Sequence, residues 1–203
     1  TLDIGEIEKD IETDISNRDF TINSIAIKYP EEILIDRFNG LKDIRKKLIR
    51  VLKEENLIKD PLRMLRAFRF MATLGFEIEE NTFNFIKADK EKILESAKER
   101  IMRELYIIFS EGEKIYETVL KMKESGLLFV LIPELKDMEG CSQVYKDKSL
   151  DILFHTLNCV YYLERFYRNY KRTFFKKYEK ELKEIFEPEN RVLLFLSIIF
   201  HDI

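Results

Sequence analysis

Apolar residues recur at intervals of three or four along most of the chain, which is the spacing of amphipathic helices. The clearest case follows Asp60-Pro61, because Asp is favoured at a helix N-cap and Pro at the first helical position. We therefore expect a helix over 62–74 that ends at Gly75. Its buried stripe should comprise four apolar residues, Leu62, Leu65, Phe68 and Ala72. The same spacing predicts helices at about 80–87, 91–96, 98–110, 112–125 and 149–187, and a last apolar helix from 190.

The first fifty residues predict a mixture of short elements. Asp14-Ile15-Ser16 is suited to cap a helix that carries residues 18–24. Residues 25–28 and 33–36 alternate between apolar and polar on either side of a turn, which predicts two short strands in a β-hairpin. After a second turn, the apolar spacing predicts a short helix over 41–48.

Composition agrees with a mostly helical protein. The chain has six Gly and four Pro in 203 residues, about 5% where ~12% is typical. Hydrophobic residues make up 45%, enough to bury a sizeable core. No apolar run approaches the roughly 18 residues of a membrane helix, and the acidic start does not resemble a signal peptide. We therefore expect neither a membrane span nor a membrane partner.

The net charge and the cysteines limit the possible binding partners and the cellular location. The net charge is only −3, so a polyanion would have to be bound by local basic patches. Cys141 and Cys159 are too few for a disulfide framework and lack the spacing of metal ligands. A reducing cytoplasm is the expected location.

Arg18, Asp19 and Asn23 are the first candidate binding residues. In a helix, Asp19 and Asn23 would share a face. Arg binds phosphate oxygens, a carboxylate accepts from sugar hydroxyls, and an amide does either. The alternative is a solvated Arg, a capping Asp and an Asn paired within the protein, and spacing alone favours this alternative.

Asp60 and Arg63 are the second candidate set. Three residues apart in the first turn of a helix, they offer an acceptor beside a donor fork. Cytosine (N4 amino and N3) and adenine (N6 amino and N1) present the matching pattern, so the pair could select a nucleotide. The alternative is an N-cap with a local ion pair. Arg66 extends the arginine spacing along the same helix.

Two further segments have charge or ligand chemistry. His155, His201 and Asp202 form a possible ligand set for a divalent metal, although the two histidines could equally be helix residues with no such role. Residues 165–183 carry eight basic and two acidic side chains, with an aromatic residue at every fourth position from Phe166 to Tyr178. This stretch suits an RNA backbone, and equally a charged helix with a buried aromatic stripe.

These motifs, in this order, resemble the tRNA nucleotidyltransferase / poly(A) polymerase family of the bacterial class II, CCA-adding type. The family motif RRDFTINA is similar to NRDFTINS at 17–24, and EDPLRMLRAxRFAxxLGF is similar to KDPLRMLRAFRFMATLGF at 59–76. Further matches are LIDRFNGLKDI at 34–44, IRV at 49–51, SAKERIMREL at 96–105, GLL at 126–128 and IPEL at 132–135. Two segments resemble the opening motifs of an HD-type metal domain, DILFHTL at 151–157 and IFHDI at 199–203.

The resemblance implies a mainly α-helical fold in three parts. These are the end of a nucleotidyltransferase head with a short β-hairpin (1–52), an all-α neck and body with a nucleotide-recognition helix (53–137), and the start of an HD-like helical domain (138–203). In such enzymes the residues matching Arg18, Asp19 and Asn23 contact ribose and triphosphate. Those matching Asp60 and Arg63 act as a protein template for the incoming base, and Arg66 is placed with these nucleotide-binding residues. The implied metal set of the HD-like part is His155, His201 and Asp202.

The implied activity is template-independent addition of CCA, or part of it, to the tRNA 3′ end, with ATP and CTP as substrates and Mg²⁺ as cofactor. The helical body would hold the acceptor arm. Two residues depart from the family pattern: Lys59 replaces Glu, and Asn17 replaces the first Arg. The Mg²⁺-binding motifs GGxxRD and DxD do not occur in the sequence, so we expect this chain alone to be inactive and its intact parent to be active.

Several alternatives stay open at this level. Within the family, the protein could be a poly(A) polymerase or an enzyme that adds only CC or only A. Outside it, the chain could be a non-catalytic helical RNA-binding module, or an HD-type phosphohydrolase. The chain does not begin with Met and ends one residue after a His-Asp pair, so we expect a piece of a longer protein. The sequence does not indicate an oligomeric state.

Overall fold

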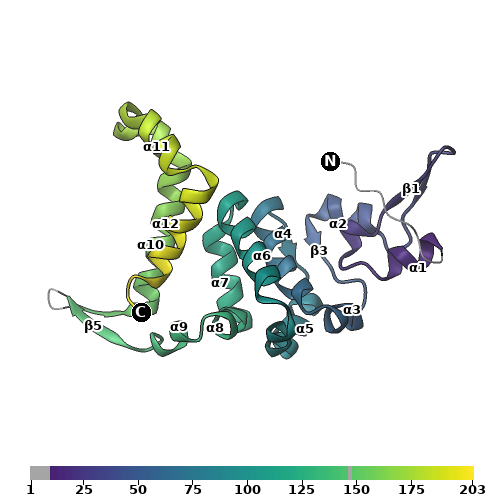
Figure 1. The fold of residues 1–203 in the computed structure, drawn as a ribbon, viewed down its shortest axis with the longest axis horizontal. Coiled ribbons are helices and arrows are strands. Elements are labelled where there is room, and N and C mark those ends of the chain that lie inside the picture. The colour runs from purple at the N-terminus through teal and green to yellow at the C-terminus, as the bar shows by residue number, and fades with distance from the viewer. Residues whose placement is uncertain (1–9, 146–147) are drawn as a thin grey trace.

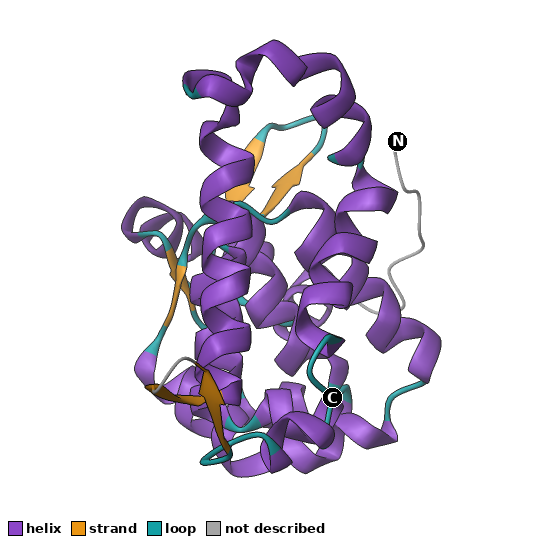
Figure 2. Ribbon diagram, turned by 90° about the vertical axis from the view of Figure 1, so that its left-hand side faces the viewer, coloured by secondary structure: helices purple, strands orange, loops and turns teal. Residues whose placement is uncertain are grey.

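The computed structural model describes residues 10–145 and 148–203. Residues 1–9, which the sequence assigns to the head, lie outside the described residues. The described chain is elongated: short strands and helices at one end lead through a central group of helices to a long helical pair at the other (Figure 1). Figure 2 shows helices throughout and strands only as short pairs. The predicted mainly α-helical fold is confirmed.

The N-terminal part alternates short helices and strands. Its elements are α1 (Ile11–Ser16), the 3₁₀ helix η1 (Thr21–Asn23), β1 (Ala26–Lys28), β2 (Ile33–Ile35), α2 (Gly40–Lys46) and β3 (Leu48–Ile49). β1 and β2 pair antiparallel, with Ala26 opposite Ile35, which confirms the predicted hairpin. The helix predicted over 41–48 is present, but it ends at Lys46, and the next residue, Lys47, adopts the left-handed conformation and leads into β3.

The prediction of one helix carrying residues 18–24 is wrong. α1 ends at Ser16, and Phe20 forms an antiparallel bridge with Val51. The Thr21 N–H donates to the carbonyl of Arg50 at 2.9 Å, and the Leu52 N–H donates to the carbonyl of Asp19 at 3.2 Å. The backbone of 19–21 is therefore hydrogen-bonded across to 50–52, and these bonds replace those of a continuing helix.

The central part is a group of helices. It comprises α3 (Glu54–Lys59), α4 (Leu62–Leu74), β4 (Glu77–Ile78), α5 (Glu80–Asp89), the 3₁₀ helix η2 (Lys90–Glu95), α6 (Lys98–Glu111), α7 (Ile115–Ser125), α8 (Leu127–Leu131) and α9 (Glu134–Asp137). β4 pairs parallel with β3 and ties this part to the first. The segment predicted as a helix over 91–96 is 3₁₀ rather than α, and the helix predicted from 112 begins at Ile115.

α4 matches its prediction closely, apart from its first residues. The four residues of the predicted stripe are all buried, and the helix ends before Gly75, whose φ of +67° is the left-handed conformation that glycine adopts freely. Its N-cap is Pro61, however, and no side chain caps the helix. The Asp60 carboxylate is used elsewhere, as described below.

The C-terminal part departs most from prediction. Its elements are β5 (Ser142–Tyr145), β6 (Lys148–Asp151), α10 (Ile152–Asn169), the 3₁₀ helices η3 (Tyr170–Arg172) and η4 (Phe174–Tyr178), α11 (Glu179–Ile185) and α12 (Pro188–Phe200). The single helix predicted over 149–187 is wrong. Asp151 caps α10 by accepting from the Phe154 N–H at 2.7 Å, which fixes the helix start after β6. The extended backbone conformation of Thr173 interrupts the helical structure a second time.

One buried hydrophobic core runs from Phe20 through α4, α6 and α7 to α10 and α12. Arg191 of α12 is buried and donates to the carbonyls of Ser110 and Gly112, which joins α12 to the end of α6. Its guanidinium also stacks on the Tyr167 ring at 4.1 Å. Within the described residues, no helix is both long and apolar enough to cross a bilayer.

Candidate functional site

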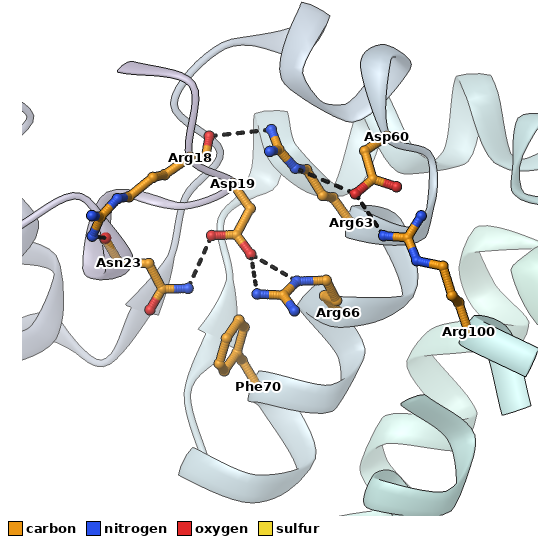
Figure 3. A pocket seen from close by; sticks show the side chains of 8 residues that line it. All are labelled: Arg18, Asp19, Asn23, Asp60, Arg63, Arg66, Phe70 and Arg100. Carbon is orange, nitrogen blue, oxygen red and sulfur yellow. Dashed lines mark hydrogen bonds and ion pairs between the residues drawn. The ribbon is translucent and has the colours of Figure 1, made fainter. Parts of the chain in front are cut away.

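A polar pocket of about 500 Å³ lies between the N-terminal part and the start of α4 and α6. Eight residues line it: Arg18, Asp19, Asn23, Asp60, Arg63, Arg66, Phe70 and Arg100. Figure 3 shows their side chains converging from the segment after α1, the turn before α4, α4 itself and α6. All six nucleotide-binding candidates predicted from the sequence thus lie around one pocket.

Asp19 is the most enclosed acid of the pocket, at 5% exposure. Its Oδ1 accepts from the Phe20 N–H at 2.8 Å and from Asn23 Nδ2 at 2.9 Å. Its Oδ2 accepts from Arg66 at 2.8 Å (Nε) and 2.7 Å (Nη2). Burial raises the pKa of this carboxyl, but the Asn23 hydrogen bond and the Arg66 charge outweigh burial and bring its pKa below the usual value. Asp19 is therefore a fixed anion.

Arg18 is held at the edge of the pocket by its own neighbours. Its Nη2 pairs with Asp14 Oδ2 at 2.8 Å, and its Nη1 donates to the carbonyl of Asn23 at 2.9 Å. The turn of residues 17–19 and the 3₁₀ helix η1 bring Arg18, Asp19 and Asn23 together without a shared α-helical face. The predicted grouping is present, but tertiary pairing with 50–52 produces it.

Asp60 and Arg63 face the same pocket, but they are not tightly paired with each other. Arg63 Nε lies 4.0 Å from Asp60 Oδ2, whereas Arg100 Nη2 donates to that oxygen at 2.9 Å. Arg63 Nη1 donates instead to the carbonyls of Asn56 at 3.2 Å and Arg18 at 3.4 Å. Within the described part of the chain, Asp60 Oδ1 and Arg63 Nη2 make no hydrogen bond. Both side chains line the pocket, so an acceptor and a donor are left there for a ligand.

Asn56 is a positioning residue that the sequence did not indicate. It is 2% exposed, and its Nδ2 donates to the carbonyls of Ser16 at 2.9 Å and Arg18 at 2.8 Å. Its own carbonyl accepts from Arg63. Asn56 therefore joins the segment after α1 to α3 and fixes the guanidinium of Arg63 from behind.

A charge network on α4 and α6 supports the pocket residues Arg66 and Phe70. Arg69 Nε donates to Glu104 Oε2 at 2.6 Å, and Arg66 Nη1 lies 3.7 Å from the other oxygen of Glu104. The Arg69 guanidinium lies 4.0 Å from the centre of the Phe70 ring. Arg100 and Phe70, which also line the pocket, were not among the predicted site residues. Both residues lie within segments that resemble the family motifs, at 59–76 and 96–105, and this resemblance could have identified them as site residues.

The net charge of the lining is positive, because four arginines face two aspartates. Such a lining suits an anionic ligand such as a phosphate. The Asp60 carboxylate and the Arg63 guanidinium, whose Oδ2 and Nε atoms are 4.0 Å apart, add an acceptor and a donor of the kinds that complement a base edge with an amino group next to a ring nitrogen.

A second cluster lies at the far end of the molecule, where α10 and α12 meet. His155, Cys159 and His201 offer ligand atoms that all lie within 4.8 Å of one another. Asp202 Oδ2 lies 3.0 Å from His201 Nε2. The three predicted metal residues are thus neighbours. Cys159 joins them, contrary to the expectation from its spacing, because one helical turn separates it from His155. Burial, and then the Asp202 charge, raise the pKa of its thiol.

The basic segment 165–183 lies far from the pocket, around the end of α10 and α11 (Figure 1). The predicted aromatic stripe is not formed: Tyr170 is 5% exposed, whereas Phe174 is 72% exposed. The break after α10 is the reason, since it turns the later aromatic residues away from the first. Lys177 lies over the Phe174 ring at 3.8 Å.

The chain matches two sequence families and several known proteins. Residues 3–50 match the poly(A) polymerase head domain, and residues 75–139 match a probable RNA- and SrmB-binding site of polymerase A. An A-adding tRNA nucleotidyltransferase of Geobacter sulfurreducens is 39% identical over 130 residues, which is 62% of this chain and 15% of that protein. Other curated relatives are named CCA-adding and CC-adding enzymes.

Solved structures agree. The CCA-adding enzyme of Thermotoga maritima complexed with tRNA superposes with a TM-score of 0.67 at 26% identity, over 93% of this chain and 40% of that one. A tRNA-processing enzyme with CTP gives a TM-score of 0.71 at 25% identity, over 96% of this chain and 48% of that one. The chain spans 15% to 34% of the length of the first curated relatives it matches.

Proposed function

Because the chain belongs to the tRNA nucleotidyltransferase / poly(A) polymerase family, we propose that it is the nucleotide-selecting part of an RNA nucleotidyltransferase. The intact protein would transfer nucleotides from CTP and ATP to the 3′ end of tRNA without a nucleic acid template. The observation that carries this proposal is the side-by-side placement of Asp60 and Arg63 in a positively charged pocket with Arg18 and Asp19.

Selection of the base follows from donors and acceptors. In this proposal the Asp60 carboxylate accepts from the amino group of cytosine (N4) or adenine (N6), while the Arg63 guanidinium donates to the adjacent ring nitrogen. Uracil and guanine have a carbonyl oxygen in place of the amino group and a ring N–H in place of the bare ring nitrogen. The Asp60 carboxylate would then face an acceptor, and the Arg63 guanidinium would face a donor. The Asp60 carboxylate is held in orientation because Arg100 donates to its Oδ2 at 2.9 Å. One pair of side chains thus accepts two bases and rejects two.

The rest of the pocket suits the sugar and the phosphates. The Arg18 and Arg66 guanidiniums lie on the same side as Asp19 and Asn23 (Figure 3). The Arg66 side chain is already held by Asp19, so little further conformational entropy is lost when its guanidinium binds a ligand. The Asn23 amide, held by Asp19, is placed to orient a ribose hydroxyl. These roles agree with those that the family resemblance implies for the same residues.

We include Mg²⁺ as a cofactor of the intact protein, where it would stabilise charge on the transferred phosphate. The pocket carboxylates described here do not fit as its ligands. Asp19 already accepts from Asn23, Phe20 and Arg66, and Asp60 from Arg100. The resemblance places the metal ligands in the motifs GGxxRD and DxD, which this sequence does not contain.

The remaining assignments for the intact protein are also proposals. The helical body would hold the tRNA acceptor arm, residues 138–203 would belong to an HD-like helical domain, and the protein would act in the cytoplasm. CCA addition is the first choice. CC addition, A addition and polyadenylation differ from it only in which nucleotides are added and how many.

The test is a primer-extension assay with the intact protein and Mg²⁺. Three tRNA substrates are compared, which end before CCA, after the first C and after the second C, each with one of the four nucleoside triphosphates. We expect CTP and ATP to be incorporated and UTP and GTP to be rejected. Limited incorporation at the correct position defines a CCA, CC or A enzyme, whereas long A tails on any RNA define a poly(A) polymerase. Failure to extend any RNA would contradict the proposal.

A further inference from the structure

The cluster at the junction of α10 and α12 has the geometry of a metal site with a sulfur ligand. His155 and Cys159 are one helical turn apart on α10, and their Nε2 and Sγ atoms are 3.6 Å apart. His201 follows the end of α12, and its ring centre lies 5.5 Å from that of His155. The side chains come from two helices that pack against each other, so the tertiary structure assembles the cluster.

One separation in the cluster agrees with tetrahedral coordination of zinc, and the ligand atoms of His155, Cys159 and His201 all lie within 4.8 Å of one another. Zinc binds cysteine sulfur at about 2.3 Å and histidine nitrogen at about 2.0–2.1 Å. A tetrahedral angle between two such bonds places the sulfur and the nitrogen about 3.6 Å apart. The separation of Cys159 Sγ and His155 Nε2 has this value.

Two contacts orient His201 within the cluster. Its Nδ1 lies 2.6 Å from the carbonyl of Ile198, and a carbonyl only accepts, so Nδ1 carries a hydrogen. Its Nε2 lies 3.0 Å from Asp202 Oδ2. These two atoms are therefore placed to bind one metal ion together. The Ile198 carbonyl would serve as the outer-shell partner that orients metal-bound histidines.

We propose that His155, Cys159 and His201, with Asp202 as the fourth ligand, bind a borderline divalent ion of the zinc type. The sulfur is the decisive ligand, because thiolate favours Zn²⁺ or Co²⁺, whereas Mg²⁺ prefers oxygen ligands. The HD-like ligand set implied by the resemblance has no cysteine, so the thiolate and the metal class that it selects are properties of this chain. Binding would displace the thiol proton to solvent. The site is separate from the nucleotide pocket and does not depend on the proposed transferase function.

Co²⁺ is a suitable probe, since a Co²⁺–thiolate bond gives a near-ultraviolet charge-transfer band that histidine and carboxylate ligands do not give. The intact protein, stripped with a chelator and kept reduced, is titrated with Co²⁺. We expect this band to appear with one equivalent, to be displaced by Zn²⁺, and to be unaffected by excess Mg²⁺. Cys159→Ser should abolish the band, whereas Cys141→Ser, the matched control on the exposed cysteine, should keep it.

Affinity gives an independent measurement. Loss of an outer-shell partner already lowers metal affinity about 10–100-fold, so His155→Ala and His201→Ala should each weaken Co²⁺ binding by at least that factor. Circular dichroism of each variant checks that the helices are retained. Two results would overturn the proposal. One is absence of the band in the stripped, folded wild-type protein, and the other is an unchanged band in Cys159→Ser.

Discussion

Arg66 provides the charge that keeps a buried carboxylate in place beside the pocket, and its removal is a demanding test of the site. In Arg66→Ala, Asp19 would keep only its hydrogen bonds from Phe20 and Asn23, at 5% exposure. Glu104 would be less affected, since it keeps Arg69 at 2.6 Å. The expected loss of stability therefore comes mainly from one unpaired acid.

The magnitude follows from the burial of the two partners. Breaking a fully buried ion pair costs about 3–5 kcal/mol. The Arg66 side chain is 32% exposed, and water screens part of that interaction, so we expect about 2–3 kcal/mol. The matched control is Arg37→Ala. Arg37 pairs with Glu12 at 2.6 Å, but both side chains are more than 60% exposed. The expected loss for that pair is below about 1 kcal/mol.

Urea unfolding of both variants, followed by circular dichroism, measures these losses as shifts of the midpoint at constant slope. A further variant separates charge from packing: Asp19→Asn in the Arg66→Ala background removes the unpaired charge. It should recover part of the lost stability. Equal losses for Arg66→Ala and Arg37→Ala, or no recovery in the double variant, would refute the account of Asp19 as a fixed, charge-compensated anion.

Two further outcomes follow from the structure. Because the pKa of Asp19 lies below its usual 3.8 in the folded state, its contribution to stability is complete above about pH 5 and is lost as pH falls through the lower, folded-state pKa. Asp19→Asn should therefore show a smaller loss of stability on acidification, measured by urea unfolding across that range. Changing basic residues of the segment 165–183 to Glu should leave the salt dependence of tRNA binding nearly unchanged, because this segment lies far from the pocket (Figure 1). Each phosphate contact contributes about 0.7–0.9 to the slope of log affinity against log salt concentration. A slope that falls by two or more would instead identify a principal tRNA contact at the four changed residues, Lys171, Arg172, Lys176 and Lys177.

Local signals in the sequence predicted those elements that local interactions determine. The helix over 62–74 has an apolar stripe, a proline before it and a glycine after it, and the structure contains that helix. The hairpin has alternating residues around a turn. Residues 18–24 were mispredicted because their backbone bonds with 50–52, a pairing that helical spacing does not reveal. The 149–187 helix was mispredicted because its capping and breaking residues, Asp151 and Thr173, were not recognised.

The same division applies to the sites. The motifs placed Asp60 and Arg63 at one pocket with Arg18 and Asp19, and the structure has this arrangement. The partner that holds Asp60 is Arg100, forty residues away in the sequence, and only the packing of α6 beside α4 reveals it. Cys159 was set aside on its spacing from Cys141. Its partners are two histidines, one of them on another helix.

The most direct test of the central claim, selection of the base by Asp60 and Arg63, is steady-state kinetics of Arg63→Ala in the intact protein. A donor fork on a base edge contributes about 1–3 kcal/mol to discrimination, which corresponds to roughly ten- to a hundredfold. We expect kcat/KM for CTP and ATP to fall by that factor, and the preference over UTP and GTP to weaken, while tRNA affinity is unchanged. Arg45→Ala, on the exposed face of α2 away from the pocket, is the control. Unchanged selectivity among the four nucleotides, or an equal loss of tRNA affinity, would contradict the account.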